Sequence, residues 1–288
     1  MKEIVIVSGK GGTGKTSISA AFAALKNEDA IACDCDVDAA NMYILLGADF
    51  KEKEDFKSGH QAFIVQEKCR SCGKCMKVCR FDAISLKEGR YFVEPFSCEG
   101  CHYCATICPT GAIEMIPQIA GESYCSSTRF GGTLVHAKLA IGAEMSGKLI
   151  AHAKTRAREA AKVKNAKYII VDGSPGIGCS VVSSLSGANL VVFVTEATIS
   201  GLHDLKRVYA LSKTFNLPSV IILNKSDLNE DAANEIEAFA SSVGVKIIGR
   251  LGYKKEAWEA LGEGKTLLEV PALKGDIMHF WEQIEQNL

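Results

Sequence analysis

The sequence predicts an α/β domain with a mostly parallel sheet covered by helices, into which a small α+β module is inserted. Short apolar runs alternate with helix-like stretches along most of the 288 residues, as in a parallel sheet with crossover helices. A glycine-rich turn follows the first apolar run, and eight of the twelve cysteines fall between Cys69 and Cys108. The chain is therefore expected to contain two chemically different parts.

The composition excludes several classes of protein. The formal net charge is -1, so no basic excess points to nucleic acid or to an anionic membrane as a partner. No apolar run reaches the length of about 18 residues that a membrane-spanning helix needs. The apolar run from Met1 to Val7 is too short for the core of a signal peptide. We expect a cytoplasmic protein that binds neither nucleic acid nor membranes.

The elements alternate from the start of the chain. We expect strands at residues 4–7 and 30–33, with helices at 16–25 and 39–46 after them. The mostly charged residues 51–58 are interpreted as a linker. After the cysteines, residues 121–141 are expected to form strands or a hairpin. The later predicted strands are 168–171, 190–195, 219–223 and 246–248, and the later helices are 146–163, 202–215, 230–242 and 276–287.

Neither the part before residue 58 nor the part after about residue 119 contains enough strands to complete a sheet alone. The sequence therefore predicts one discontinuous domain of residues 1–57 and 119–288. The cysteine-rich residues 58–118 are expected to be an insertion into it.

The glycine-rich turn matches the pattern G-x-x-x-x-G-K-[ST] in full, from Gly9 to Thr16. It follows a strand and precedes a helix, so backbone N–H groups and the helix dipole can hold phosphate. Lys15 is expected to reach the β- and γ-phosphates, and Thr16 to bind Mg²⁺. The predicted nucleotide-binding residues of this loop are Gly11, Gly12, Thr13, Gly14, Lys15, Thr16 and Ser17.

The additional lysine of the loop, Lys10, makes it resemble the deviant Walker A group. That group includes the MinD/ParA ATPases and the nitrogenase iron protein. The resemblance implies that Lys10 reaches the nucleotide of a partner subunit, so the chain forms a homodimer when ATP is bound. Lys10 then neutralises charge during phosphoryl transfer, as an arginine finger does. The implied cofactor is ATP with Mg²⁺.

Two carboxylates complete the predicted catalytic set with Lys10 and Lys15. Asp36 stands where the family has its switch I carboxylate, with Asn41 five residues on, as in MinD. Asp34 and Asp38 are nearby alternatives, and helix capping is an alternative role for Asp36. Asp172 ends an apolar strand and resembles the Walker B position, where a carboxylate binds Mg²⁺ through water.

Asn224 ends another predicted strand, and the family places an asparagine there against the base. The stretch Asn224-Lys225-Ser226-Asp227 also resembles the N-K-x-D guanine motif of GTPases. GTP is therefore an alternative nucleotide, although the family favours ATP.

The eight clustered cysteines form two runs of C-x-x-C-x-x-C-x-x-x-C. Dense, regularly spaced cysteines in a reducing compartment favour metal over disulfides. Zinc sites use separate C-x-x-C pairs with a longer spacer, so zinc fits this spacing less well. The runs have the bacterial ferredoxin spacing, which predicts two [4Fe-4S] clusters.

In that ferredoxin pattern the fourth cysteine of each run binds the other cluster. The first run departs from the pattern at Arg80, where a proline is usual. The resemblance implies that Cys69, Cys72, Cys75 and Cys108 hold cluster 1, and that Cys98, Cys101, Cys104 and Cys79 hold cluster 2.

The remaining cysteines are expected to be core thiols: Cys33, Cys35, Cys125 and Cys179. Cys125 or Cys179 as a ligand of a bridging cluster is the alternative. His102 is interpreted as a surface histidine. The stretch from Gly142 to Lys148 resembles one that recurs after the insertion in MinD-like proteins with inserted ferredoxin domains, and it gives Ser146 and Lys148 no defined role.

Together these motifs predict an ATPase that couples switch movements to electron transfer to a redox partner, as the nitrogenase iron protein does. An ATPase that assembles or carries iron–sulfur or metal cofactors is the alternative, and its partner is a metallocofactor protein. A MinD-like positioning protein needs a basic amphipathic C-terminal helix. The last helix has acidic residues among its polar positions, which predicts a docking helix instead.

Overall fold

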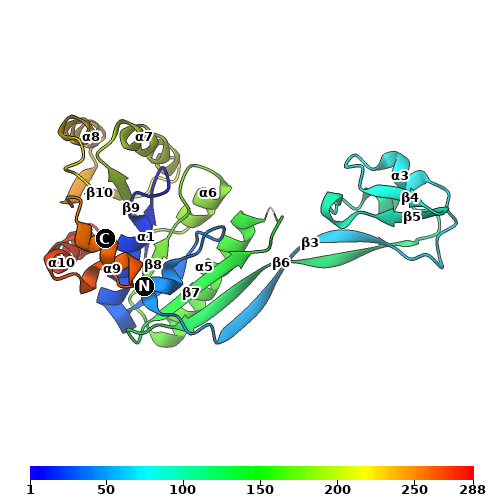
Figure 1. Ribbon diagram of the computed structural model, residues 1–288, viewed down its shortest axis with the longest axis horizontal. Coiled ribbons are helices and arrows are strands. Elements are labelled where there is room, and N and C mark those ends of the chain that lie inside the picture. The colour runs from blue at the N-terminus through cyan, green and yellow to red at the C-terminus, as the bar shows by residue number, and fades with distance from the viewer. Residues whose placement is uncertain (144) are drawn as a thin grey trace. The chain divides into compact units, whose positions relative to one another are not determined.

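The computed structural model describes residues 1–143 and 145–288. Two compact units make up this part of the chain. The larger unit comprises Met1–Glu54, Ser123–Leu139 and Ser146–Leu288, and the smaller unit comprises Asp55–Glu122 and Ala140–Met145. The chain passes from one unit to the other within β3 and returns within β6 (Figure 1).

Among the described residues, the main sheet holds nine strands in the order β11-β10-β9-β1-β8-β2-β7-β6-β3. The pairings from β11 to β7 are all parallel. This confirms the predicted fold class. The strands are β1 Lys2–Val7, β2 Ala30–Asp34, β3 Glu52–Ile64, β4 Ile84–Lys87, β5 Arg90–Val93, β6 Ile113–Ser127, β7 Thr133–Leu139, β8 Tyr168–Asp172, β9 Leu190–Glu196, β10 Ser219–Asn224 and β11 Lys246–Arg250.

Helices cover the central strands, which are apolar on both faces as parallel strands usually are. The α-helices are α1 Lys15–Lys26, α2 Met42–Leu46, α3 Lys74–Val78, α4 Tyr103–Thr106, α5 Ser146–Lys164, α6 Cys179–Leu185, α7 Ile199–Lys213, α8 Glu230–Val243, α9 Lys255–Gly262 and α10 Pro271–Gln286. Short 3₁₀ helices are η1 Asn27–Asp29, η2 Pro95–Ser97 and η3 Leu267–Glu269.

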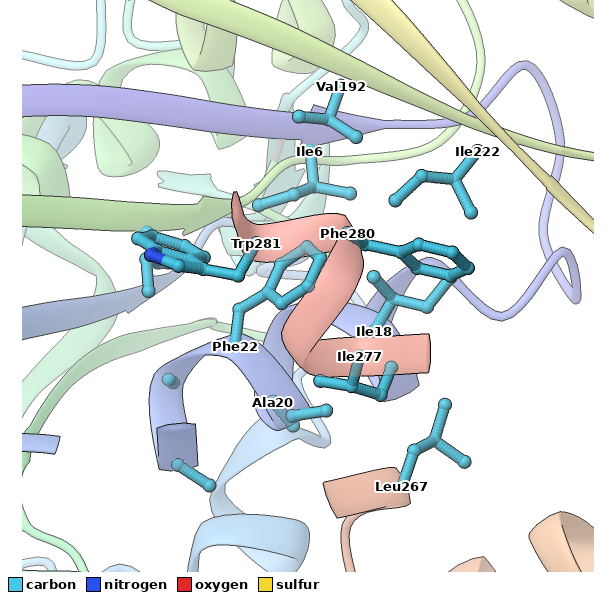
Figure 2. Close-up of a cluster of buried hydrophobic side chains, with 14 of the residues drawn as sticks. Ile6, Ile18, Ala20, Phe22, Val192, Ile222, Leu267, Ile277, Phe280 and Trp281 are labelled. Carbon is cyan, nitrogen blue, oxygen red and sulfur yellow. The ribbon is translucent and has the colours of Figure 1, made fainter. Parts of the chain in front are cut away.

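The C-terminal helix α10 packs into the core of the larger unit. Phe280 and Trp281 are 2% and 3% exposed, and Figure 2 shows them beside Phe22 of α1, near the strand residues Ile6 and Ile222. The rings of Phe22 and Trp281 meet edge to face at 5.4 Å. The predicted docking helix therefore docks on its own domain. In the described part of the chain, no helix is long and apolar enough to cross a membrane.

The smaller unit holds the cysteine runs. Strands β4 and β5 form an antiparallel pair, and helices α3 and α4 pack against one another. A small apolar core of Ala62, Ile64, Ile84, Tyr91 and Ile113 packs against six of the cysteines, which are Cys69, Cys75, Cys79, Cys98, Cys104 and Cys108.

Two local predictions were wrong. Residues 51–58 are not a linker, because β3 runs from Glu52 to Ile64 as the edge strand beside β6. Most of its first ten residues are exposed, so burial imposed no apolar alternation on them. The helix predicted at 39–46 is shorter in the structure, where α2 comprises only Met42–Leu46. Residues 36–41 instead form a loop around the Asp34 carboxylate.

Candidate nucleotide site and cysteine cavities

The phosphate loop lies between β1 and α1, as its motif predicts. Gly14 caps α1 with a left-handed backbone, φ 90°, and has no side chain to occupy the free N–H groups of the first turn. A Cβ on Gly14 would lie 2.3 Å from the Asn224 side-chain nitrogen. The Asn224 side chain donates a hydrogen bond to the Thr13 carbonyl at 2.8 Å. The end of β10 therefore stabilises the conformation of the phosphate loop.

Asp172 is fully buried and brings the loop lysine and threonine together. Lys15 Nζ lies 2.8 Å from Asp172 Oδ1, and the Thr16 hydroxyl donates to Asp172 Oδ2 at 2.6 Å. Ser19 also donates to Asp172, at 2.8 Å. The sequence analysis missed Ser19, although it lies one helical turn after Lys15 on the same face of α1.

The two neighbouring aspartates of the switch I segment have different surroundings. Asp34 is fully buried and accepts backbone hydrogen bonds from Asp36, Asn41 and Met42. Burial, and next the charge of Asp172, raise the pKa of Asp34 to about 7. Asp36 is half-buried and lines the same cavity as the phosphate loop and Asn41. The alternative residue Asp38 is exposed. The switch I role of Asp36 stays a prediction.

The same cavity is also lined by Asn224, by residues of α9 that include Trp258, and by Tyr253 in the segment before α9. In the described part of the chain, the buried Thr13 hydroxyl has no hydrogen-bond partner. A phosphate-rich ligand with a flat base fits a cavity that is lined both by the backbone of a phosphate loop and by aromatic rings.

Lys10 points to its own chain in this structure. Its Nζ lies 2.7 Å from Glu196 Oε1 and donates to Ser200 Oγ at 2.7 Å. The other carboxylate oxygen of Glu196 pairs with Lys225 at 2.8 Å, and Lys225 also donates to the Gly12 carbonyl. The sequence analysis missed Glu196, although it ends an apolar strand just as Asp172 does.

The eight clustered cysteines line two separate cavities of the smaller unit, four in each. Their empty spaces are about 340 and 370 Å³, open solvent included. Three cysteines of each cavity come from one run and the fourth comes from the other. One cavity is lined by Cys69, Cys72, Cys75 and Cys108, and the other by Cys79, Cys98, Cys101 and Cys104.

The donor set fits a cluster better than a single ion. Among residues 1–143 and 145–288, no three His, Cys, Asp or Glu side chains converge closely enough for one metal ion. A cubane cluster spreads four thiolates around a larger volume. The Ala112 N–H donates to Cys108 Sγ at 3.3 Å, a contact that favours thiolate. The assignment of both ligand sets stays a prediction.

The other predicted positions lie as follows. Cys33 and Cys35 are buried, as expected, with their sulfurs 3.6 Å apart. Cys179 is exposed, so the expectation of a core thiol was wrong there, because it starts α6 at the surface. Cys125 is half-buried. Lys148 is exposed near the start of α5, and Glu144 of the same stretch lies outside the described residues.

His102 is exposed, as predicted. Its ring meets that of His60 at 4.8 Å, edge to face.

Curated relatives match most of the chain. An uncharacterized protein of Methanocaldococcus jannaschii, MJ0578, is 36% identical over 230 residues, which cover 79% of each chain. Shorter partial matches are the indolepyruvate oxidoreductase subunit IorA of Methanothermobacter marburgensis, 39% identical over 56 residues, and Ferredoxin-3 of Nostoc, 37% identical over 65 residues. They cover 19% and 16% of this chain, and 9% and 67% of those proteins.

Solved structures share the fold at low identity. The cell division ATPase MinD of Pyrococcus furiosus superposes with a TM-score of 0.59 at 18% identity, covering 99% of this chain and 98% of that one. MinD of Pyrococcus horikoshii with Mg-ADP gives 0.58 at 19% identity, covering 98% and 95%. The profile of the CobQ/CobB/MinD/ParA nucleotide binding domain matches residues 4–267. The chain therefore belongs to the CobQ/CobB/MinD/ParA nucleotide-binding family.

Proposed function

We propose that this chain hydrolyses ATP, dimerises in the ATP-bound state, and uses nucleotide-driven movement to control electron transfer from two [4Fe-4S] clusters to a partner protein. The observation that carries the proposal is the division of the eight cysteines into two cavities of four, on a chain that also has a complete phosphate loop. Short matches to an oxidoreductase subunit and to a ferredoxin support the redox half.

The nucleotide half follows from the groups around Asp172. In the proposed complex, Lys15 leaves Asp172 to contact the β- and γ-phosphates, and Thr16 and Asp172 hold the Mg²⁺ that accompanies ATP. Asp36 lines the same cavity as the phosphate loop, and its proposed role is to orient the attacking water. Lys10 of the second subunit neutralises the charge that develops on the phosphoryl group.

ATP is the proposed nucleotide because Asp227 is already engaged. In a guanine-reading motif this carboxylate must face the base. Here Asp227 Oδ1 accepts a hydrogen bond from the Tyr253 backbone N–H at 2.7 Å. The cavity is lined by Asn224 and Lys225 of the same stretch, and Asp227 is absent from its lining.

The cysteine half follows from the four cysteines that line each cavity. The proposed clusters supply one-electron transfer at low potential when bound. The chain would contribute four thiolates to each. In the cavity of Cys69 it also supplies the apolar side chains of Ile64 and Ile113 and the N–H donor of Ala112. Burial and N–H···S bonds are the means by which a protein sets a cluster potential.

We propose that the nucleotide site and the clusters are coupled because of the order in which their segments follow one another along the chain. The smaller unit follows the Asp36 segment in sequence, and the chain then returns to β8, which ends at Asp172. Both segments are expected to respond to the γ-phosphate. A nucleotide that moves them acts on the two ends of the chain segment that carries the cysteines.

The test is an anaerobic titration of both clusters followed by electron paramagnetic resonance. The protein is measured without nucleotide, with Mg-ADP and with Mg and a non-hydrolysable ATP analogue. We expect about eight iron and about eight sulfide per chain, and at least one midpoint potential that differs between the ATP-analogue and ADP states. A Lys15→Ala chain is the control, because it should show the same potentials in all three states.

Three results would count against the proposal. Zinc in place of iron removes the redox half, and identical potentials in all three states of the wild type remove the coupling. Rapid transfer of the clusters to an apo-ferredoxin, at a rate that ATP increases, favours the alternative of a cluster-carrier ATPase.

A further inference from the structure

We propose that Glu196 is a positioning residue that holds Lys10 inside its own subunit, and that release of this contact limits how readily the ATP-bound dimer forms. The inference deepens the proposed function and rests on it, because it assumes that Lys10 acts on the nucleotide of a second subunit. It assigns to Glu196 and Ser200 a role in regulating assembly.

The contact is well defined. Glu196 is the last residue of β9 and lies opposite Asn224 of β10 in the sheet register. Its side chain is 11% exposed, whereas that of Lys10 is 30% exposed. Glu196 Oε1 is 2.7 Å from Lys10 Nζ, and Ser200 Oγ accepts a second hydrogen bond from the same amine at 2.7 Å. The side chains of Glu196 and Ser200 therefore both hold the Lys10 amine.

The two possible contacts of Lys10 exclude one another. The amine that lies 2.7 Å from Glu196 cannot at the same time contact a phosphate bound to another chain. Each subunit must break this contact before its Lys10 crosses the dimer interface. Because the dimer needs two such releases, the dimer dissociation constant contains the cost of the contact twice.

Release does not leave a buried charge unpaired. Glu196 Oε2 stays 2.8 Å from Lys225, and Lys225 also donates to the Gly12 carbonyl at 2.9 Å. The second lysine thus compensates the carboxylate when Lys10 leaves, which keeps the cost of opening low. Thr198 adds a weaker contact to Glu196 Oε1, at 3.5 Å.

The experiment measures the dimer dissociation constant by sedimentation velocity, using the full chain with its clusters and Mg plus a non-hydrolysable ATP analogue. Removing a partly exposed ion pair of this kind is expected to favour release about fivefold per subunit, which is about 25-fold for the dimer. Glu196→Gln should therefore dimerise at lower concentration than the wild type. Ser200→Ala should shift the constant in the same direction by a smaller factor.

Two further variants separate this role from a general structural one. Adding Glu196→Gln to a Lys10→Ala chain should change neither the dimer constant nor the steady-state rate, because the residue acts through Lys10. Lys225→Met removes the second lysine that pairs with Glu196 and leaves the contact between Glu196 and Lys10 in place. This variant should therefore not strengthen the dimer. Nucleotide affinity of each variant, measured at concentrations where it is monomeric, controls for changes in the cavity.

The possible failures are distinguishable. A wild-type chain that stays monomeric with the analogue at every concentration overturns the proposed dimer and this inference with it. Equal constants for the wild type, Glu196→Gln and Ser200→Ala overturn this inference alone. An effect of Glu196→Gln that persists in the Lys10→Ala background also overturns it.

Discussion

The hydroxyl of Thr16 donates a 2.6 Å hydrogen bond to Asp172 Oδ2, which ties the first turn of α1 to the end of β8. The same carboxylate holds Lys15 at 2.8 Å. In the structure, therefore, the predicted phosphate-binding lysine and the predicted Mg²⁺-binding hydroxyl are both engaged by Asp172. In the proposed complex, binding of Mg-ATP redistributes these contacts and so couples the nucleotide to the end of β8.

Asp172→Asn should separate binding from hydrolysis. The variant removes the negative charge that competes with phosphate for Lys15, so ATP affinity should be unchanged or higher. Loss of the carboxylate beside the proposed Mg²⁺ position should lower kcat by about 100-fold or more. Equilibrium nucleotide binding and steady-state phosphate release measure the two effects. The exposed Asp38→Asn is the matched control, and equal kcat values for all three proteins would contradict the assigned role.

Gly14→Ala should destabilise the chain even without nucleotide. A Cβ there would lie 2.3 Å from the Asn224 side chain, on a backbone with φ +90°, which should cost about 1–3 kcal/mol in unfolding free energy. Gly11→Ala is the control, since a Cβ on Gly11 meets nothing within 4 Å and should change stability by less than about 0.5 kcal/mol. Chemical denaturation of both proteins is the measurement. Similar losses for the two variants would exclude this steric explanation.

How far the sequence predicts this molecule depends on how local each signal is. The phosphate loop and the cysteine runs are contiguous patterns whose chemistry requires fixed spacing. The loop residues could therefore be predicted from the motif, and the cysteines of each cavity could be grouped through the resemblance to ferredoxins. Glu196 acquires its role only from the register of β9 against β10 and from the start of α7. Neither spacing nor residue type indicates that it meets Lys10, which is 186 positions away in the chain.

The errors in secondary structure have a similar origin. Glu52–Ile64 is an edge strand that is mostly exposed at its start, so it lacks the apolar alternation by which strands are recognised. In the predicted helix at 39–46, the Asp34 carboxylate competes for the N–H groups of Asn41 and Met42. That competition is a tertiary effect, and helix propensity does not describe it.

ATP should bind more tightly than GTP, by at least about tenfold. Asp227 Oδ1 accepts a hydrogen bond from the Tyr253 backbone N–H, and Asp227 does not line the cavity, so we expect that it does not read a guanine edge. Competition binding with both nucleotides gives the ratio for the wild type and for Asp227→Asn. The ratio should be the same in both proteins. A preference for GTP that Asp227→Asn abolishes would establish the guanine-motif interpretation instead.

Glu269 should contribute stability that depends on pH. Hydrogen bonding by Arg129, at 2.7 Å, lowers the pKa of Glu269 from 4.5 to about 2. A carboxyl with a depressed folded-state pKa stabilises the fold fully above its unfolded pKa and loses that contribution as pH falls through the folded value. Glu269→Gln should therefore cost about 1 kcal/mol at pH 7, and the difference from wild type should shrink between about pH 4.5 and pH 2.

Urea denaturation across this range measures the Glu269 effect. The nearby Glu263→Gln serves as control, because Glu263 pairs with Lys265 and its side chain is 62% exposed. A constant difference between wild type and Glu269→Gln down to pH 2 would show that packing, rather than the Arg129 contact, explains the loss.

Each cysteine cavity is lined by three cysteines of one run and one of the other, an arrangement that we call crossed. It predicts how pairs of cysteine substitutions change the iron content. Cys108 belongs to the second run in sequence but shares a cavity with Cys69 of the first, and Cys98 lines the other cavity. If each cavity holds one cluster, Cys69→Ser with Cys108→Ser removes ligands from the same cluster and should leave about four iron per chain. Cys98→Ser with Cys108→Ser affects both clusters and should leave almost none. Uncrossed ligation, in which each run holds its own cluster, predicts the reverse order. Iron and sulfide analysis after anaerobic reconstitution distinguishes the two patterns, with the exposed Cys179→Ser expected to retain the full complement.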